Sequence, residues 1–347
     1  MSYFRNFLGI HLTVLLGALL LLSVPQAANA GHAAFSADQQ TVYLTVFDAS
    51  GTLQSVNLET SETRDLKFPE LTEAPDEPEI KAISPSKNGG FWLLTAKALW
   101  HWDGGVPTVQ KIADAPEGVT FEDVAGRRDG DGSVVVTGSI KDPDEQGRTG
   151  RMFFKQDAQA PLLQVFVRRL DEIDCPVYLD DGSLLFATEG DLWHGVVEFE
   201  RGDQGFADRG VLSAYRYAPL AVRSTYVGTS MQTGATEIAA SRDQIYVHAS
   251  RMEGSGWGSL VRLQRPPRLQ KHDLKMHWDL QDRMNIYVSA IRSLQILDPD
   301  CSAEPFLCES ADGTLIHFRR SYGEDKAHSF LVTKDGPLEP VPQEPKR

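Results

Sequence analysis

The feature that most constrains the fold is a recurring pattern of short β-branched and aromatic runs, each preceded by a turn rich in Asp, Asn, Gly or Ser. Such runs are typical of β-strands, and the residues before them are typical of tight turns. Long stretches with helical periodicity are scarce after residue 31, so the sequence predicts an all-β fold. The runs are Thr41–Val46, Phe91–Thr95, Ser133–Thr137, Ser183–Thr188, Gln244–His248, Asn285–Ser289 and Thr314–Phe318.

The spacing of these runs predicts a β-propeller. The points compared are Val42, Phe91, Val134, Leu184, Ile245, Ile286 and Leu315. They lie 49, 43, 50, 61, 41 and 29 residues apart, and most of these intervals match the roughly 40 to 50 residues of a four-stranded blade. We expect seven blades, with six or eight as alternatives, because the last interval is too short for a full blade. A two-domain β-sandwich and an irregular barrel are the other architectures considered.

A ring of blades buries both faces of each small sheet and leaves only short edges exposed. Closing such a ring normally requires a strand from one terminus to complete the blade at the other. We therefore expect Phe330–Thr333 to pair with the strand at Val42 or at Val56.

Two stretches resemble the blades of bacterial regulator-type propellers. One contains Asn88-Gly-Gly-Phe-Trp92, Thr95 and Leu99-Trp-His-Trp-Asp103; the other contains Asp181–Thr188 followed by Asp191–His194. The resemblance covers about 40 residues and implies the propeller architecture. It implies no activity and no catalytic residue, because such blades occur in sensors, scaffolds and enzymes alike.

The first 30 residues have the order of a secretory signal peptide. Arg5 precedes an apolar segment, Phe7–Val24, and Pro25 is followed by the small-residue cleavage motif Ala28–Ala30. An uncleaved membrane anchor is the alternative. We expect a cleaved signal peptide over 1–30, a propeller over 31–336 and a Pro-rich disordered tail over 337–347. The mature protein would be soluble, periplasmic or extracellular, with no stable membrane span.

The charge balance excludes general binding to nucleic acids. The chain has 34 Lys and Arg against 48 Asp and Glu, a net charge of −14, and an acidic surface repels phosphate backbones. The sequence also has neither a phosphate-binding P-loop nor a dinucleotide fingerprint. The partner expected is another envelope or secreted protein, and the oligomeric state is open.

Three cysteines bear on the redox chemistry. In an oxidising compartment Cys301 and Cys308 could form a disulfide across a short loop. Cys175 is then left over, either as a buried and inert thiol or as a reactive or intermolecular one.

Spaced carboxylates suggest one metal site. Asp142 and Asp144 offer the oxygen ligands that Ca²⁺ prefers, although ordinary turn chemistry also explains them. No other cofactor is expected. A Trp-His neighbourhood recurs, and it predicts either a ligand site at one mouth of the channel or simple strand packing. Its members are Trp100–Trp102, Trp193–His194 and His277–Trp278.

The candidate binding surface is rich in residue types that are common at protein interfaces. It comprises Tyr215, Arg216, Tyr217, Arg223, Tyr226 and Trp257. The alternative is that Tyr215 and Tyr217 are strand residues packed between blades. The sequence contains no Gly-x-Ser-x-Gly nucleophile motif.

Two functions remain. The first is an exported, soluble propeller that binds a protein or another ligand in the cell envelope. The second is a secreted hydrolase or lyase, with acid and base residues from several blades at the mouth of the central channel.

Overall fold

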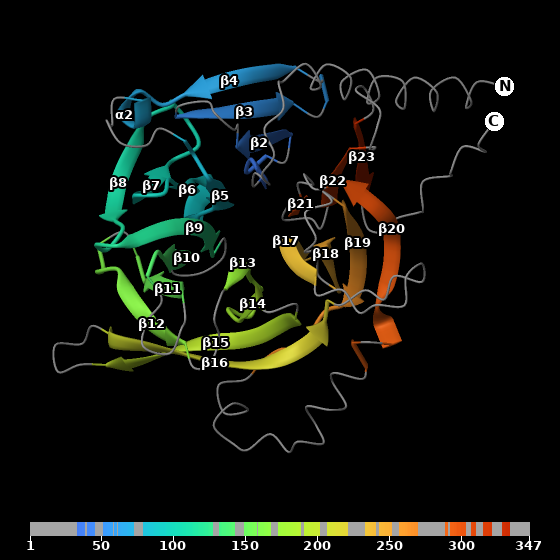
Figure 1. Cartoon of the computed structure of the whole chain (residues 1–347). Helices are drawn as coiled ribbons and strands as arrows, with labels where there is room; N and C mark the ends of the chain where they lie inside the picture. The colour runs from blue at the N-terminus through green and yellow to red at the C-terminus, as the bar shows by residue number, and fades with distance from the viewer. Residues whose placement is uncertain are drawn as a thin grey trace.

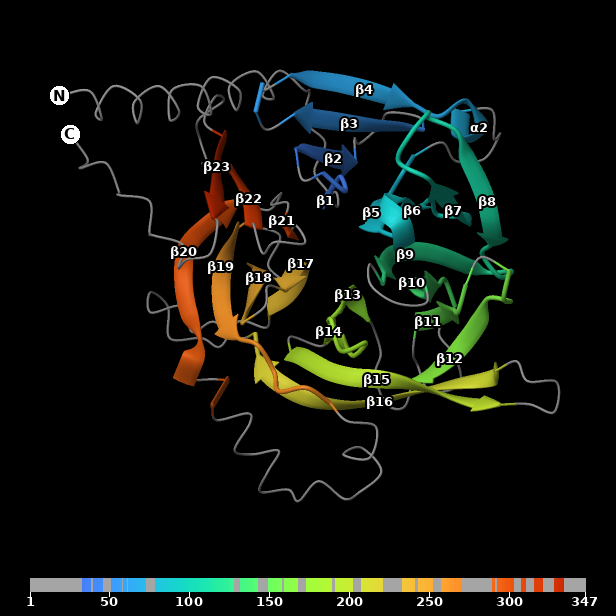
Figure 2. The same ribbon diagram turned by 180° about the vertical axis from the view of Figure 1, so that it is seen from behind.

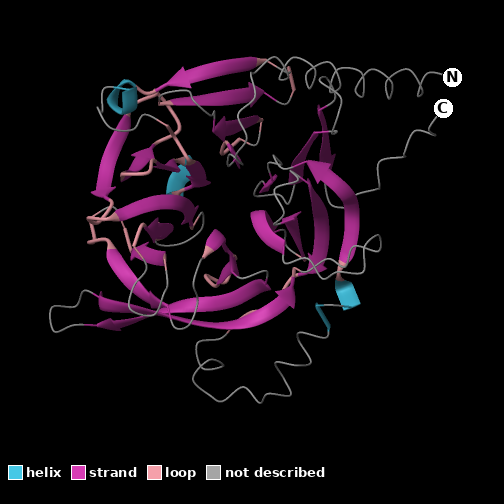
Figure 3. Cartoon of the chain, in the orientation of Figure 1, coloured by secondary structure: helices cyan, strands magenta, loops and turns pink. Residues whose placement is uncertain are grey.

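The computed structural model describes the strand-rich body of the chain. The described residues are 33–38, 40–45, 51–57, 59–60, 62–72, 79–127, 132–142, 149–157, 159–167, 173–188, 191–201, 207–220, 233–240, 243–251, 257–269, 289–290, 292–302, 307–309, 315–320 and 328–333. The predicted signal peptide (1–30) and tail (337–347) lie outside these ranges. Strands dominate what is described, beside short helical segments that include α2 (Pro69–Thr72), η2 (Lys87–Gly89) and residues 289–290 and 292–293 (Figure 3).

The described strands form six blades of antiparallel strands, arranged in a ring (Figure 1). The first blade contains β1 (Ala33–Phe35), β2 (Thr41–Thr45), β3 (Thr52–Asn57) and β4 (Thr63–Lys67). The second contains β5 (Ala82–Pro85), β6 (Phe91–Leu94), β7 (Ala98–Trp102) and β8 (Val109–Asp114).

The third blade contains β9 (Val119–Gly126), β10 (Val134–Ile140), β11 (Gly150–Lys155) and β12 (Leu163–Val167). The fourth contains β13 (Asp174–Tyr178), β14 (Leu184–Thr188), β15 (Asp191–Arg201) and β16 (Ala207–Pro219). The fifth contains β17 (Thr233–Ala240), β18 (Gln244–Arg251), β19 (Trp257–Gln264) and β20 (Gln295–Ser302). The sixth contains β21 (Leu307–Glu309), β22 (Leu315–Arg320) and β23 (His328–Thr333).

The ring is closed by its innermost strands. Figure 2 shows β1, β5, β9, β13, β17 and β21 around the middle, with β4, β8, β12, β16 and β20 at the periphery. Each inner strand contacts the inner strands of the blades before and after it, and β21 contacts β1. This is the arrangement of a β-propeller, so the predicted fold is confirmed.

The predicted number of seven blades is not confirmed, because the described strands form six. Six of the seven predicted runs overlap the second strand of a blade, from β2 to β22. The remaining run, Asn285–Ser289, belongs to the connection between β19 and β20 and lies almost entirely outside the described residues.

The second strands of the second and fourth blades, β6 and β14, are mostly apolar because both of their faces are buried. Successive side chains on a strand point to opposite faces. In β6, Phe91 and Leu93 pack toward the first blade, whereas Trp92 and Leu94 pack toward the third. Each interface from the first blade to the fifth thus has its own apolar cluster.

One glycine is required where two blades approach most closely. A Cβ atom on Gly126 would lie 2.1 Å from the carbonyl oxygen of Pro85 and 2.4 Å from Cδ1 of Trp92. Both distances are far shorter than van der Waals contact. The end of β9 therefore accepts no larger residue without displacement of the second blade.

The third and fourth blades are joined into one eight-stranded sheet. The outer strand β12 pairs in parallel with β16, with Val165 opposite Gly210 and Val167 opposite Leu212. This contact is possible because β15 and β16 are long, 11 and 13 residues, and extend beyond their own blade.

The predicted ring closure is wrong. Phe330 lies in β23, but its backbone partner is Phe318 in β22 of the same blade. Val42 and Val56 pair with each other inside the first blade. The N-terminal strands already form a complete four-stranded sheet, so they have no vacancy for a strand from the other terminus. In the part of the chain that the structure describes, no helix has the length and apolarity needed to span a membrane.

Candidate functional site

Three consecutive inner strands carry an acidic residue at the same blade position. We call Asp123 on β9, Asp174 on β13 and Glu237 on β17 the inner-strand acids. In each blade, the residue paired with the acid is the fourth buried residue of the second strand. The residues opposite them, in the same order, are Thr137, Ala187 and His248.

A β-bulge lies directly beside each inner-strand acid. The strand register shifts by one residue next to Asp123 in β9, after Asp174 in β13 and before Glu237 in β17. Bulges change the direction of neighbouring side chains and are frequent next to active sites. Three β-bulges beside equivalent residues of three consecutive blades mark this part of the ring as a candidate site.

The bulge in β13 contains a strained residue. Cys175 has a φ of 49°, in the left-handed region that residues other than glycine seldom occupy. Its backbone N–H donates a hydrogen bond of 2.9 Å to Oδ2 of Asp123. An inner-strand acid of the third blade therefore contacts the strained residue of the fourth.

The inner-strand acids differ in exposure. Glu237 and the opposite His248 are 2% and 0% exposed, and Asp123 is 9% exposed. Asp174 is only partly buried. Of the three carboxyl groups, that of Asp174 is the most accessible to a ligand.

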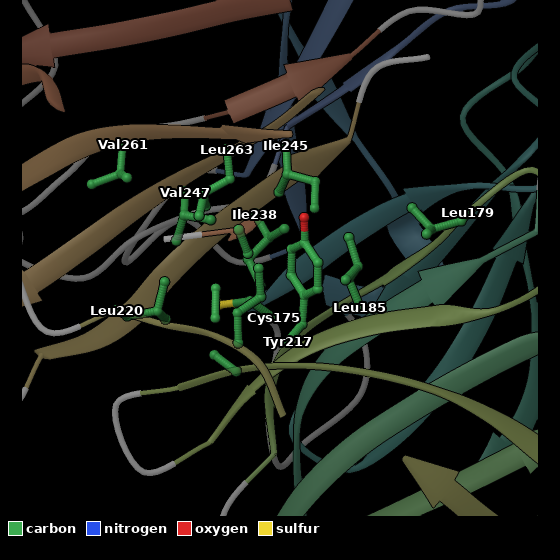
Figure 4. Close-up of a cluster of buried hydrophobic side chains, with 14 of the residues drawn as sticks. Cys175, Leu179, Leu185, Tyr217, Leu220, Ile238, Ile245, Val247, Val261 and Leu263 are labelled. Carbon is green, nitrogen blue, oxygen red and sulfur yellow. The ribbon is translucent and has the colours of Figure 1, made fainter. Parts of the chain in front are cut away.

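Burial and the inner-strand acids together affect the Cys175 thiol. Its pKa is raised first by burial and then by the charges of Asp123, Glu237 and Asp174. A thiol is a nucleophile only as the thiolate, so Cys175 is not poised for covalent chemistry. Figure 4 shows its sulfur among apolar side chains, including Tyr217 and Ile238. Its burial agrees with the inert alternative.

The Cys175 thiol should react with a maleimide only after unfolding. In a variant with Cys301 and Cys308 replaced by serine, the rate at pH 8 is expected to be at least about 100-fold slower in buffer than in urea. Mass spectrometry of quenched samples measures the labelled fraction. Similar rates in the two conditions would contradict the buried, neutral thiol.

A second polar network lies between the fourth and fifth blades. His194 is 0% exposed; its Nε2 lies 2.8 Å from Ser183 Oγ and its Nδ1 lies 2.8 Å from the Tyr215 hydroxyl. Ser183 Oγ donates to Asp181 Oδ1 at 2.5 Å. The carboxylate also accepts from the backbone N–H of Leu269, in the segment after β19.

These contacts fix the position of every proton in the network. A carboxylate can only accept, so the Ser183 hydroxyl donates to Asp181 and accepts from His194 Nε2–H. His194 Nδ1 is then an acceptor for the Tyr215 hydroxyl. Burial lowers the pKa of His194 to about 4, against the opposing charge of Asp181 and with a contribution from Arg265. The imidazole is therefore neutral at pH 7.

The Trp-His neighbourhood serves packing in the two blades where it is described. His101, at the same blade position as His194, lies 2.7 Å from Ser86 Oγ through its Nε2 and packs on Trp92. Each histidine thus bonds to a serine of its own blade. His277 and Trp278 lie outside the described residues.

Two tyrosines of the predicted binding surface are buried, which agrees with the alternative that they are strand residues packed between blades. Tyr215 and Tyr217 are 3% and 2% exposed, because they lie on β16 and alternation directs both into the core. The Tyr217 hydroxyl donates to the carbonyl oxygen of Gln264. Arg216 points outward and forms an ion pair with Asp191 at 2.5 Å.

The other predicted residues are only partly described. Arg223 and Tyr226 lie outside the described ranges, and only the backbone of Trp257, at the start of β19, is described. The predicted calcium ligand Asp142 is exposed just after β10, and Asp144 is outside the described ranges. Within those ranges, no group of three or more His, Cys, Asp or Glu residues is arranged to hold a metal ion.

The predicted disulfide is not supported. Cys301 lies on β20 and Cys308 on β21, the outer strand of one blade and the inner strand of the next. Their side chains are outside what the structure describes, so the pairing stays a prediction.

Sequence reasoning missed the inner-strand acids because they belong to three separate blades. A local signal was present: each acid stands in a short apolar run just before the turn that leads into a second strand. Asp123 precedes Val124, Asp174 follows Ile173 and Glu237 precedes Ile238. Alignment of the repeats on the first strands would have placed the three acids together.

Comparison with solved structures shows the fold. A calcium-binding protein, regucalcin, from Agrobacterium tumefaciens has a TM-score of 0.54 at 10% identity, covering 92% of this chain and 95% of its own. A putative gluconolactonase has a TM-score of 0.53 at 11% identity, covering 91% and 95%. A PQQ-bound aldose sugar dehydrogenase from Streptomyces coelicolor has 0.52 at 12%, covering 89% and 95%.

At such identities the likeness supports the β-propeller fold and nothing finer. No protein-family model matches the sequence, and no curated protein matches it.

Proposed function

We propose that this protein is a ligand-binding β-propeller whose site is formed by the inner-strand acids and whose ligand carries a positive charge. The observation that supports the proposal is the placement of Asp123, Asp174 and Glu237 at equivalent positions of three consecutive inner strands, each beside a β-bulge. Charges interact more strongly where water is partly excluded. A cation bound there would gain more than at an exposed acidic turn.

Two kinds of ligand share this chemistry. A divalent metal ion would take a carboxylate oxygen of Asp174 and complete its coordination with water, because the described residues hold no group of three or more His, Cys, Asp or Glu arranged around one ion. An organic ammonium would donate hydrogen bonds to the same oxygens. In either case we assign the direct contact to Asp174, since its carboxyl group is less buried than those of the other two inner-strand acids.

Replacing Asp174 by asparagine should weaken cation binding at least about tenfold, which corresponds to about 1.4 kcal/mol. Isothermal titration calorimetry on the full chain, with CaCl₂, MnCl₂ and spermidine as separate probes, measures the affinity and distinguishes metal from ammonium. Asp142→Asn is the matched control, because it removes one exposed carboxylate outside the proposed site. The proposal fails if no probe binds, or if Asp142→Asn weakens binding as much as Asp174→Asn.

We further propose that the protein acts in the cell envelope, in contact with an exported partner. The support for this is the predicted signal peptide over 1–30. Cell fractionation with an antibody against the full chain tests it, and a purely cytoplasmic pool would contradict it.

A second candidate function is hydrolysis or elimination at the same site. It is favoured by the strained Cys175 between carboxyl groups, because backbone strain gathers at catalytic sites and carboxyl groups can act as general acids and bases. The putative gluconolactonase among the proteins of similar fold suggests sugar lactones as the first substrates to screen. Turnover that Asp174→Asn abolishes would favour the enzyme over the binding module.

A further inference from the structure

We infer that Asp123 is a positioning residue: it holds Cys175 in its left-handed conformation, and the bulge thus fixed aims the Asp174 carboxyl group at the ligand. The inference deepens the proposed function and rests on it. It assigns different tasks to two of the inner-strand acids, with Asp174 as the contact and Asp123 as its support.

The first argument is the place of the hydrogen bond between Cys175 N–H and Asp123 Oδ2. The strands β9 and β13 are the two ends of the eight-stranded sheet and do not pair with each other. They nevertheless contact each other on the inner side of the ring. The bond is buried, and a charged acceptor makes it stronger than a neutral one. It therefore fixes the bulge of one strand against the other.

The second argument is the conformation that the bond holds. A φ of 49° is unfavourable for cysteine, because its Cβ atom crowds the backbone. Such a conformation persists only where the surroundings impose it. The Asp123 carboxylate is a buried, direct contact of the Cys175 backbone, and it is well placed to impose it.

The third argument is the position of Asp174, which precedes Cys175 in the chain. Asp174 is still in register with Ala187, and the register is shifted by the time the strand reaches Val177. Regular pairing of β13 with β14 thus ends at Asp174, and the dihedral angles of Cys175 determine the direction of the chain immediately after it. The Cys175 side chain points into apolar surroundings, while Asp174 stays partly exposed.

The chain offers variants that separate hydrogen bond, charge and strain. Asp123→Asn removes the charge but keeps an amide oxygen that can accept from the Cys175 N–H. Asp123→Ala removes both. Cys175→Gly removes the strain, because glycine adopts positive φ readily. Cys175→Ala is the matched control, since it removes the thiol but keeps the Cβ atom.

The first readout needs no ligand. In the Cys301→Ser/Cys308→Ser background, Asp123→Ala should raise the rate at which a maleimide labels Cys175 at least about tenfold above the rate in Asp123→Asn. Both variants lose the same charge, so the difference between their labelling rates measures the effect of the hydrogen bond from the Cys175 N–H. Equal rates in the two variants would overturn the positioning role, whatever the ligand is.

The second readout is the affinity for CaCl₂ and for spermidine. Asp123→Ala should bind the active probe at least about tenfold more weakly than Asp123→Asn, and adding Cys175→Gly, but not Cys175→Ala, should recover most of that loss. No recovery with glycine would overturn the inference. If Asp123→Ala does not fold, the comparison is made between the two double variants. If wild type binds neither probe, the proposed function fails, and with it the role of Asp174, while the labelling rates still decide what Asp123 does.

Discussion

Replacing Trp102 by alanine is expected to lower the free energy of unfolding by about 4 kcal/mol. Trp102 is 1% exposed and lies between the first and second blades. Its ring stacks on Phe91 with centroids 5.1 Å apart, and the edges of Tyr43 and Phe68 approach it at 4.9 and 5.4 Å. Alanine would leave a large cavity among three aromatic rings from both blades, which cannot all move to fill it.

Urea denaturation followed by circular dichroism measures this loss. Val106→Ala is the control, because Val106 is 71% exposed and exposed positions usually change stability by less than about 0.5 kcal/mol. The indole Nε1–H donates to the carbonyl oxygen of Val106, at 3.0 Å, and alanine keeps that oxygen. A loss below about 1.5 kcal/mol for Trp102→Ala would show that this interface is looser than the contacts indicate.

Replacing His194 by phenylalanine is expected to cost about 3 kcal/mol at pH 7. The ring volume is kept, but the buried Tyr215 hydroxyl loses its acceptor and Ser183 loses a donor. His101→Phe is the matched control at the same blade position. It breaks the single bond to Ser86, so its cost should be about 1 kcal/mol.

The effect of His194→Phe should fade as the pH falls from 7 to 4. The unfolded histidine binds a proton below pH 6.5, whereas the folded one, with a pKa of about 4, resists protonation. The unfolded state then binds more protons, so wild-type stability falls with falling pH. A shift of about 2.5 units corresponds to about 3 kcal/mol. Urea midpoints at several pH values test this, and a constant gap between the two proteins would contradict it.

The second strands of the second and fourth blades could be predicted from the sequence because both of their faces are buried. Residues such as Phe91 and Leu184 belong to continuous apolar runs that follow strong turn residues. The blade number could not be predicted in the same way. The run at Asn285 has the same local chemistry, and nothing in its sequence says whether it begins a blade or belongs to a connection.

The candidate site could not be predicted because it depends on strand register. Asp123 and Glu237 each stand in a short apolar run before a turn, but only the pairing of their strands places them at one level of the ring. The left-handed backbone of Cys175 has no signal in its own residue type. The role of Tyr215 and Tyr217 was left open for a related reason: a tyrosine has the same preference for an interface as for a buried strand, and alternation along β16 decided between them.

The parallel pairing of β12 with β16 has a consequence for what the site can recognise. It makes Asp123 and Asp174 members of one hydrogen-bonded sheet, so the spacing between these two charges is resistant to deformation. Glu237 belongs to a different sheet, and the described strands of the fourth and fifth blades do not pair with each other. Side-chain repacking can therefore move Glu237 relative to the other two. A ligand would therefore contact two acids, Asp123 and Asp174, whose fixed spacing selects the spacing of its charges. It would also contact Glu237, whose position can adjust to the size of the ligand.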